Sequence, residues 1–305
     1  MAVWARLRAR PEAGGDGGRG RRGRHWAAGV SVVVLLLGVG AYVLFQKARP
    51  YLHGSGCEVN TSSGKMPLDL EQGANAATIA AVAFRKQLPE RAVVIAYATA
   101  IQESHIRNLA GGDRDSVGMF QQRPSQGWGS PDKLRDPVQA TSKFFDALVK
   151  VKDYLDRDLH DAAQRVQRSA DGRAYAQHED DGVLLARAFT GREPGTARCW
   201  FPPDKRTASR RPEAVREMRR AFGGRLQVTG PSPLAYNAPS RPNAWNAVRV
   251  TNARAGWAVA AWAVTHAQVY GLTEIRYAGR HWQSTAGHDG WTEDKPAPTT
   301  AVIIQ

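Results

Sequence analysis

The feature that most constrains this chain is an uncharged apolar run, AAGVSVVVLLLGVGAYVLF, over residues 27–45. Its length suits a helix that crosses a bilayer. Arginines crowd residues 1–26, which we expect to be a disordered basic cytoplasmic tail, whereas only Lys47 and Arg49 follow the run closely. This asymmetry predicts a single-pass cell-membrane protein with residues 46–305 outside. A cleaved signal peptide is the alternative, although the run is long for one.

An outside location changes how the two cysteines, Cys57 and Cys199, are interpreted. In an oxidising compartment they most simply form one disulfide that ties together the ends of a globular segment. Two free buried thiols are the alternative. The eight histidines are scattered, and no Cys/His cluster has the spacing of metal ligands. We therefore expect a disulfide, no metal and no cofactor.

Hydrophobic periodicity predicts a stalk at 46–66, a mainly α domain at 67–200, a linker at 201–225 and a small α+β domain at 226–305. Helices are expected at 75–88, 89–104, 136–151, 159–169, 180–189 and 252–271, with one more in the linker at PEAVREMRRAF. Asp136 followed by Pro137 is an N-cap signal. The segments LTEIRYAG and AVIIQ are typical of strands.

One carboxylate, Glu103, ends the predicted helix 89–104, one turn after the small residues Thr99 and Ala100. Small neighbours would let a ligand approach and supply no cation, which disfavours the charged form of a carboxyl group. A general acid that works near neutral pH needs such a setting. A surface glutamate at a helix end is the alternative.

The segment after Glu103, GGDRDSVGMFQQRP, combines turn-forming glycines with side-chain amides. Gln121 and Gln122 suit sugar hydroxyl and acetamido groups, and Trp128 offers a face for a sugar ring. Asp113 and Asp115 are either loop caps or a second carboxylate that positions water.

Glu103-Ser104, then Ser116-Val117-Gly118-Met119-Phe120-Gln121 and Pro124, resemble the motifs of lysozyme-like soluble lytic transglycosylases and goose-type lysozymes. The resemblance implies a lysozyme-like domain that cleaves peptidoglycan glycan strands. Glu103 would protonate the glycosidic oxygen, then act as base while the N-acetylmuramic acid 6-hydroxyl or water attacks the anomeric carbon. The expected substrate contacts are Ser104, Ser116, Gly118, Met119, Gln121, Gln122, Trp128, Gln167 and Tyr175.

The last two of these residues mark a departure from the family. The family continues with Ala-Tyr-Asn-Ala-Gly, whereas VQRSADGRAYAQH here offers Gln167, Ser169 and Tyr175 instead. Two hypotheses follow. The chain is either a membrane-anchored lytic transglycosylase or muramidase, or an inactive lysozyme-like protein that binds peptidoglycan or acts as a cell-wall scaffold.

The C-terminal segments RAGWAVAAWAV and YAGRHW resemble a small domain attached to cell-wall hydrolases of high-GC Gram-positive bacteria. Its tryptophans belong either to the core or to a sugar- or peptide-facing surface: Trp257, Trp262, Trp282 and Trp291. The net charge of +14 favours polyanionic partners. Together with the topology it predicts contact with the cytoplasmic membrane and with anionic wall polymers. No nucleic-acid-binding motif is present, so nucleic acid is not expected as a partner.

Overall fold

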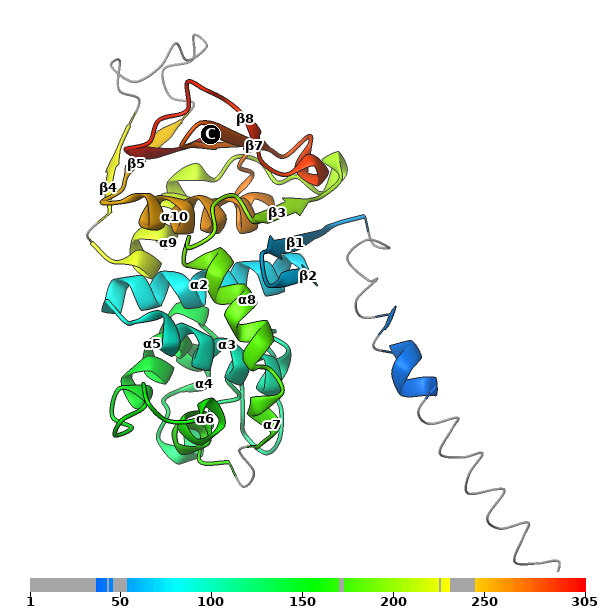
Figure 1. Cartoon of the computed structure of the whole chain (residues 1–305), viewed down its shortest axis with the longest axis vertical. Coiled ribbons are helices and arrows are strands. Elements are labelled where there is room, and N and C mark those ends of the chain that lie inside the picture. Colours follow the sequence, from blue (N-terminus) through cyan, green and yellow to red (C-terminus); the bar gives the residue numbers. More distant parts are fainter. Residues whose placement is uncertain (1–36, 43, 46–53, 170–172, 225, 231–244) are drawn as a thin grey trace, which may run out of the picture. The chain divides into compact units, whose positions relative to one another are not determined.

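The computed structural model describes residues 37–42, 44, 45, 54–169, 173–224, 226–230 and 245–305 (Figure 1). The chain divides into two compact units, residues 1–47 and 48–305. In the first unit, residues 37–42, 44 and 45 are helical. The predicted tail and most of the predicted span 27–45 lie outside the described residues. Within the described ranges, no helix combines the length and apolar character that a membrane crossing requires.

The second unit begins with strands where a stalk is expected. Strands β1 (Gly56–Thr61), β2 (Gly64–Leu68) and β3 (Ala197–Trp200) form an antiparallel sheet in the order β2-β1-β3. Cys57 lies opposite Cys199 in this sheet, and the two form the predicted disulfide. The stalk prediction is therefore wrong from residue 56 onward. These strands are short, and their partner β3 lies more than a hundred residues away, so local periodicity gave no sign of them.

Helices dominate the part of the chain between β2 and β3, here called the helical part (residues 69–196). They are α2 (Leu70–Lys86), α3 (Glu90–Ser104), α4 (Pro131–Leu134), α5 (Pro137–Leu148), α6 (Leu159–Gln167), α7 (Arg173–Ala176) and α8 (Glu179–Phe189), with a 3-10 turn η1 at Pro124–Gln126. The five helices expected in this part are confirmed. Asp136 caps α5 as predicted, because its Oδ1 accepts hydrogen bonds from the backbone N–H groups of Val138 and Gln139 at 3.0 and 3.1 Å.

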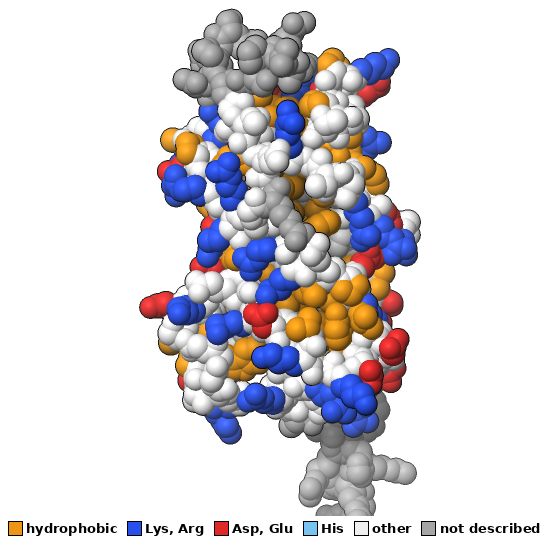
Figure 2. Space-filling model, turned by 90° about the vertical axis from the view of Figure 1, so that its left-hand side faces the viewer, with side chains coloured by type: hydrophobic (Ala, Val, Ile, Leu, Met, Phe, Trp, Pro, Cys, Tyr) orange, Lys and Arg blue, Asp and Glu red, His pale blue; other side chains and the backbone are white. Residues whose placement is uncertain are grey.

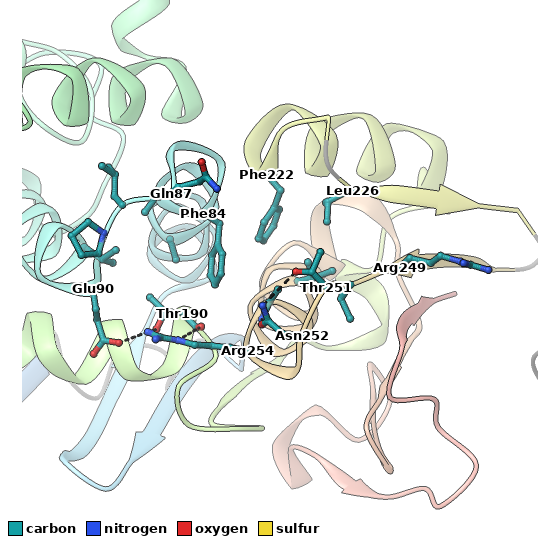
Figure 3. Close-up of a pocket in the computed structure, with 18 residues that line it drawn as sticks. Phe84, Gln87, Glu90, Thr190, Phe222, Leu226, Arg249, Thr251, Asn252 and Arg254 are labelled. Carbon is teal, nitrogen blue, oxygen red and sulfur yellow. Dashed lines mark hydrogen bonds and ion pairs between the residues drawn. The ribbon is translucent and has the colours of Figure 1, made fainter.

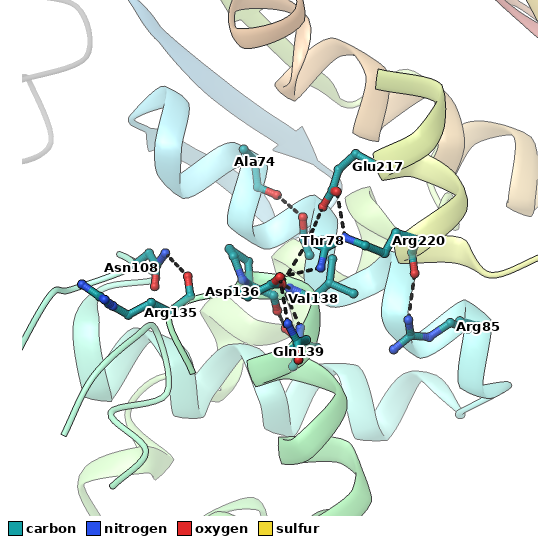
Figure 4. Close-up of polar contacts among 12 residues, drawn as sticks. Ala74, Thr78, Arg85, Asn108, Arg135, Asp136, Val138, Gln139, Glu217 and Arg220 are labelled. Atoms are coloured by element: carbon teal, nitrogen blue, oxygen red, sulfur yellow. Dashed lines mark hydrogen bonds and ion pairs between the residues drawn. The ribbon is translucent and has the colours of Figure 1, made fainter. Parts of the chain in front are cut away.

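Helix α9 (Arg211–Phe222) lies within the segment predicted as a linker and confirms the short helix expected there. Its Ala214, Met218 and Ala221 are fully buried. Arg220 of α9 donates to both carboxylate oxygens of Asp136, the N-cap of α5, and also pairs with Glu217 (Figure 4). Helix α9 is thus fastened to the helical part through the same carboxylate that starts α5.

The C-terminal part (residues 226–305) is built on an antiparallel sheet in the order β4-β5-β9-β6-β7-β8. Its strands are β4 (Gln227–Thr229), β5 (Asn246–Arg249), β6 (Glu274–Tyr277), β7 (Arg280–Gln283), β8 (Thr292–Glu293) and β9 (Ala301–Ile304). Both strands expected here are confirmed as β6 and β9. The predicted helix 252–271 is confirmed as α10 (Ala253–Thr265) and α11 (Ala267–Tyr270).

Helix α10 lies between this sheet and α2, so it belongs to the core of both parts (Figure 1). Gly256 of α10 is required by close packing, because a Cβ atom there would lie 2.0 Å from the Tyr277 ring. The four tryptophans named in the sequence analysis adopt the core alternative. Trp262 and Trp282 are fully buried, Trp257 is buried, and Trp291 is partly buried, donating its indole N–H to the Ala197 carbonyl at 2.9 Å.

Candidate functional site

Glu103 lies in the last turn of α3, and the chain leaves this helix in a fixed way. His105, the C-cap, is left-handed with φ of 53°, and its N–H bonds to the carbonyl of Ile101 at 2.9 Å. Two side chains of α2 then bind the next carbonyls. Gln72 donates to His105 at 2.9 Å, and Asn75 donates to Ile106 at 2.8 Å. The start of α2 therefore anchors the end of α3, which holds Glu103 in place.

The two residues that mark the departure from the family's Ala-Tyr-Asn-Ala-Gly, Gln167 and Tyr175, meet at the Glu103 carboxyl group. The Tyr175 hydroxyl donates to Glu103 Oε1 at 2.7 Å, and Gln167 Nε2 donates to the same oxygen at 3.0 Å. Gln167 Nε2 also donates to the carbonyl of Phe120 at 2.7 Å. The structure thus brings together three predicted site residues from α3, α6 and α7, and joins them to the loop after α3.

The donors at this carboxyl group are neutral. Tyr175 is only 3% exposed, and its burial together with the nearby Glu103 charge raises the pKa of its phenol far above the ordinary value. Tyr175 therefore keeps its proton and stays a donor at any physiological pH. Among the described residues, nothing binds Glu103 Oε2, and the buried Oε1 of Gln167 accepts no hydrogen bond. One carboxyl oxygen is held while the other remains available.

The small residues that precede Glu103 do not line an approach to it, contrary to expectation. Ala96, Thr99 and Ala100 are wholly buried inside the helical part. Helix α3 packs closely on α8, where a Cβ atom at Gly182 would lie 2.9 Å from the carbonyl of Val94. The small side chains of α3 therefore serve helix packing. A ligand would have to reach Glu103 from the partly exposed face of the last turn of α3, where the Glu103 side chain itself lies.

Several residues predicted as substrate contacts instead hold the loop together. Ser104 is buried, and its hydroxyl donates to the carbonyl of the fully buried Met119 at 2.7 Å. Gln122 is also buried, and its amide donates to the carbonyl of Ala140 at 3.3 Å. Their side chains are turned inward, so we correct their role to positioning. Ser104 fixes the loop against α3, and Gln122 fixes it against α5.

The turn at Gly118 explains the glycine in the motif. Gly118 has φ of 77°, and a Cβ atom there would lie 2.2 Å from the carbonyl of Leu134. Gln121 folds back over this turn, because its Nε2 donates to the carbonyl of Gly118 at 2.9 Å. Its Oε1 accepts from the buried Ser116 hydroxyl at 3.1 Å. These groups close the loop on itself, which keeps the Phe120 carbonyl pointed at Gln167.

The two loop aspartates differ in their contacts. Asp115 accepts from Arg123 at 2.9 Å and from the backbone N–H and hydroxyl of Ser125 at 2.7 and 2.9 Å. These bonds, with that from Arg123 the strongest, lower the pKa of Asp115 to about 2. Asp113 is exposed and lies 3.9 Å from Arg114. The contacts of Asp115 favour the loop-cap alternative for that residue.

Trp128 lies beside a cavity of about 470 Å³ formed by the residues after η1, by α5 and by the last turn of α6. Val166 and Arg168, the neighbours of Gln167 in the chain, line this cavity, whereas Glu103 does not. The cavity also has basic walls that we had not predicted, from Lys143 and Lys150. The seven-residue spacing of these lysines is the one signal in the sequence that could have indicated this wall, because residues seven apart lie on the same side of a helix.

A second cavity of about 380 Å³ separates the α2–α3 connection from α9 and the start of α10 (Figure 3). Phe84 and Phe222 approach each other across it, with ring centroids 6.2 Å apart. At its edge Arg254 bonds to Glu90 and to Thr190. The cation Arg254 and the acid Glu90 pair with each other here, whereas the cavity-lining Arg249 takes no part in that pair, and none of the predicted site residues lines this cavity.

Metal-ligating side chains do not gather in the described parts of the chain, where no group of three or more His, Cys, Asp or Glu residues is found. Two histidines of the C-terminal part, His281 and His288, contact aromatic or hydroxyl side chains. His288 stacks on Trp200 with centroids 4.7 Å apart, and His281 lies 3.2 Å from the Thr292 hydroxyl.

Comparison with known proteins leaves the family open. No protein-family model matches the chain, and no curated protein matches it.

Proposed function

We propose that this protein is a glycosidase of the lytic transglycosylase or muramidase type that cleaves peptidoglycan glycan strands, with Glu103 as general acid and base. The observation that carries the proposal is the convergence of Tyr175 and Gln167 on one oxygen of Glu103. The sequence resemblance predicts both as site residues, and they lie 72 and 64 residues after Glu103 in the chain. A surface glutamate at a helix end has no need of such partners.

The contacts suggest how the reaction would run. Glu103 carries its proton on Oε2 and gives it to the glycosidic oxygen as the bond from that oxygen to the anomeric carbon breaks. The hydroxyl at position 6 of the same sugar, or a water molecule, then bonds to the anomeric carbon and returns its proton to Glu103. Tyr175 and Gln167 hold Oε1 throughout and stabilise the carboxylate between the two steps.

We further propose that residues 46–305 lie outside the cytoplasmic membrane, anchored by residues 27–45, where peptidoglycan is found. The disulfide between Cys57 and Cys199 supports an oxidising compartment, since such bonds are rare in a reducing cytosol. Surface Lys and Arg side chains, spread along the face shown in Figure 2, suit contact with anionic polymers of the wall.

The test is digestion of purified peptidoglycan by the full chain, followed by separation of the released fragments. Fragments ending in 1,6-anhydro-muramic acid would mean attack by the sugar hydroxyl, and reducing ends would mean attack by water. Glu103→Gln should abolish release, while Glu213→Gln, a change in α9 at a residue that pairs with Arg216, should not. Release that survives Glu103→Gln would remove the assigned acid.

The alternative is an inactive lysozyme-like protein that binds peptidoglycan or acts as a scaffold. Purified peptidoglycan also distinguishes this alternative from the glycosidase. A wild-type chain that sediments with peptidoglycan and releases no fragments under any condition would support it. The replacement of the family's asparagine by Gln167 is the feature that favours this alternative.

A further inference from the structure

We propose that the cavity beside Trp128 binds an acidic sugar of the glycan through its carboxylate or phosphate group. The inference rests on the proposed glycosidase function and names the kind of substrate that the site would select. The cavity, of about 470 Å³, is large enough for a small ligand. Its walls carry an aromatic face and an excess of positive charge.

The positive charge comes from basic side chains that mostly lack acidic partners. Those lining the cavity are Lys143, Lys150, Arg165 and Arg168, and the one acid is Asp146. Asp146 is already paired with Lys86 at 2.6 Å, and Arg165 with Asp161 at 3.0 Å. In the portion of the chain that the structure describes, the other three cations have no acidic partner. A ligand with negative charge would supply it.

The aromatic face and the cations occupy the same part of the cavity. Trp128 is half-buried, with its ring packed partly against the apolar core. Lys143 extends over the next residue, since a Cβ atom on Gly129 would lie 3.4 Å from Lys143 Nζ. An indole beside an ammonium group suits a ring with one apolar face and an acidic substituent. A neutral sugar would use only the indole.

Two segments of chain lead from the residues that contact Glu103 to the cavity lining. Gln167, which donates to Glu103, stands between the cavity-lining residues Val166 and Arg168. The loop carrying Phe120, the other partner of Gln167, continues into η1 and Trp128. A glycan seated at Glu103 would therefore meet the cavity with a neighbouring sugar, so acid recognition there would set which strands are cut.

The experiment measures binding to full-length Glu103→Gln protein, which holds glycans without cutting them, by calorimetry at low and high salt. The probes are a neutral N-acetylglucosamine oligomer, one of equal length bearing muramic acid carboxylates, and one bearing phosphates. We expect an acidic oligomer to bind about tenfold more tightly than the neutral one at low salt. The carboxylate and phosphate arms decide which acid is preferred.

The matched variants remove equal charge at different places. Lys143→Gln, Lys150→Gln and Arg168→Gln together should abolish the preference. Lys65→Gln, Lys133→Gln and Arg249→Gln together, which remove three surface cations outside the cavity, should keep it. Thermal unfolding monitors folding, and if the first triple variant fails to fold, Lys150→Gln and Arg168→Gln are measured singly, because both residues are exposed. Each should then weaken the preference.

Equal affinity for neutral and acidic oligomers, or a preference that survives the cavity variants, would overturn the proposal. Tighter binding of a single-stranded oligonucleotide would do so as well. Cleavage by wild-type protein is read separately. A preference for acidic oligomers without cleavage would contradict only the proposed glycosidase function. Cleavage without that preference would contradict only the proposed acidic-sugar site.

Discussion

Two half-buried glutamates of the helical part are held in opposite ways. Glu193, just before β3, has both oxygens bound. The backbone N–H of Ser62 donates to Oε2 at 2.7 Å, while the Ser62 hydroxyl and Arg187 donate to Oε1 at 2.6 and 2.9 Å. Glu103 accepts only neutral donors, Tyr175 and Gln167, and both bind the same oxygen.

The contrast teaches what separates a structural carboxylate from one available for chemistry. The Ser62 bonds, followed by that from Arg187, lower the pKa of Glu193 to about 2, so this residue is an anion near neutral pH and joins the turn after β1 to the chain before β3. A carboxylate that accepts hydrogen bonds on both oxygens exchanges a proton with a ligand less readily than one with an open oxygen. Within the part of the chain that the structure describes, Glu103 accepts hydrogen bonds on Oε1 alone, so its Oε2 is available to a ligand. We expect this difference to separate the effects of substitutions at the two residues.

The largest expected effect is on activity. Glu103→Gln keeps the shape of the side chain and one oxygen that can accept from Tyr175 and Gln167, but it removes any proton transfer. We expect fragment release from peptidoglycan to fall about a thousandfold, in the usual range for loss of a general acid or base. Glu193→Gln is the matched control and should leave the rate at neutral pH unchanged. Equal losses in the two variants would erase the distinction between them.

The next largest expected effect is on stability, and it comes from the disulfide in the sheet β2-β1-β3. Replacing Cys57 and Cys199 with serine removes a link that closes a loop with a sequence separation of 142. The free energy of unfolding should fall by about 4 kcal/mol, because the unlinked unfolded chain gains conformational freedom. Urea unfolding with and without reductant measures it. Reductant should weaken the wild type and leave the double variant unaffected, and a double variant as stable as the oxidised wild type would contradict the prediction.

How much of this fold could be read from the sequence depended on the range of the contacts. Helices α3 and α5 were predicted from local signals, namely apolar spacing and the Asp136–Pro137 start. Strands β1 and β3 were missed, because each acquires its conformation from a partner far away in the chain. Only the cysteines, one on each strand, hinted that the two segments meet.

The candidate site shows the same limit. The motifs selected Glu103, Gln167 and Tyr175, and the structure places them in contact. They did not reveal that Ser104 and Gln122 face inward, since spacing along the chain says nothing about which way a loop side chain turns. The basic cavity wall was also missed. The spacing of Lys143 and Lys150 indicated one side of it, but the contribution of α6 depends on the folded arrangement of α5 and α6.

A smaller effect on activity should follow from Tyr175→Phe, which removes one of the two donors at Glu103 Oε1. We expect about a tenfold loss, the usual scale for one hydrogen bond to a charged group. The loss should lie mostly in kcat, because the bond is needed when the carboxylate forms. Tyr154→Phe, a change at a partly buried tyrosine that does not contact Glu103, is the control. A rate unchanged by Tyr175→Phe would show that Gln167 alone positions the acid.

The smallest effect is the response of Glu193 to acid. Its pKa is about 2 in the folded protein and about 4.3 in an unfolded chain. A lowered folded pKa means that the stabilisation is complete above about pH 4.3 and is lost as pH falls through about 2. Glu193→Gln should therefore cost about 1 kcal/mol near neutral pH and flatten the unfolding profile between those values. If the free energy of unfolding falls in parallel for the wild type and the variant, the bonds from Ser62 and Arg187 do not stabilise the folded state. The hydrogen bonds on both oxygens of Glu193 would then not give this residue a structural role.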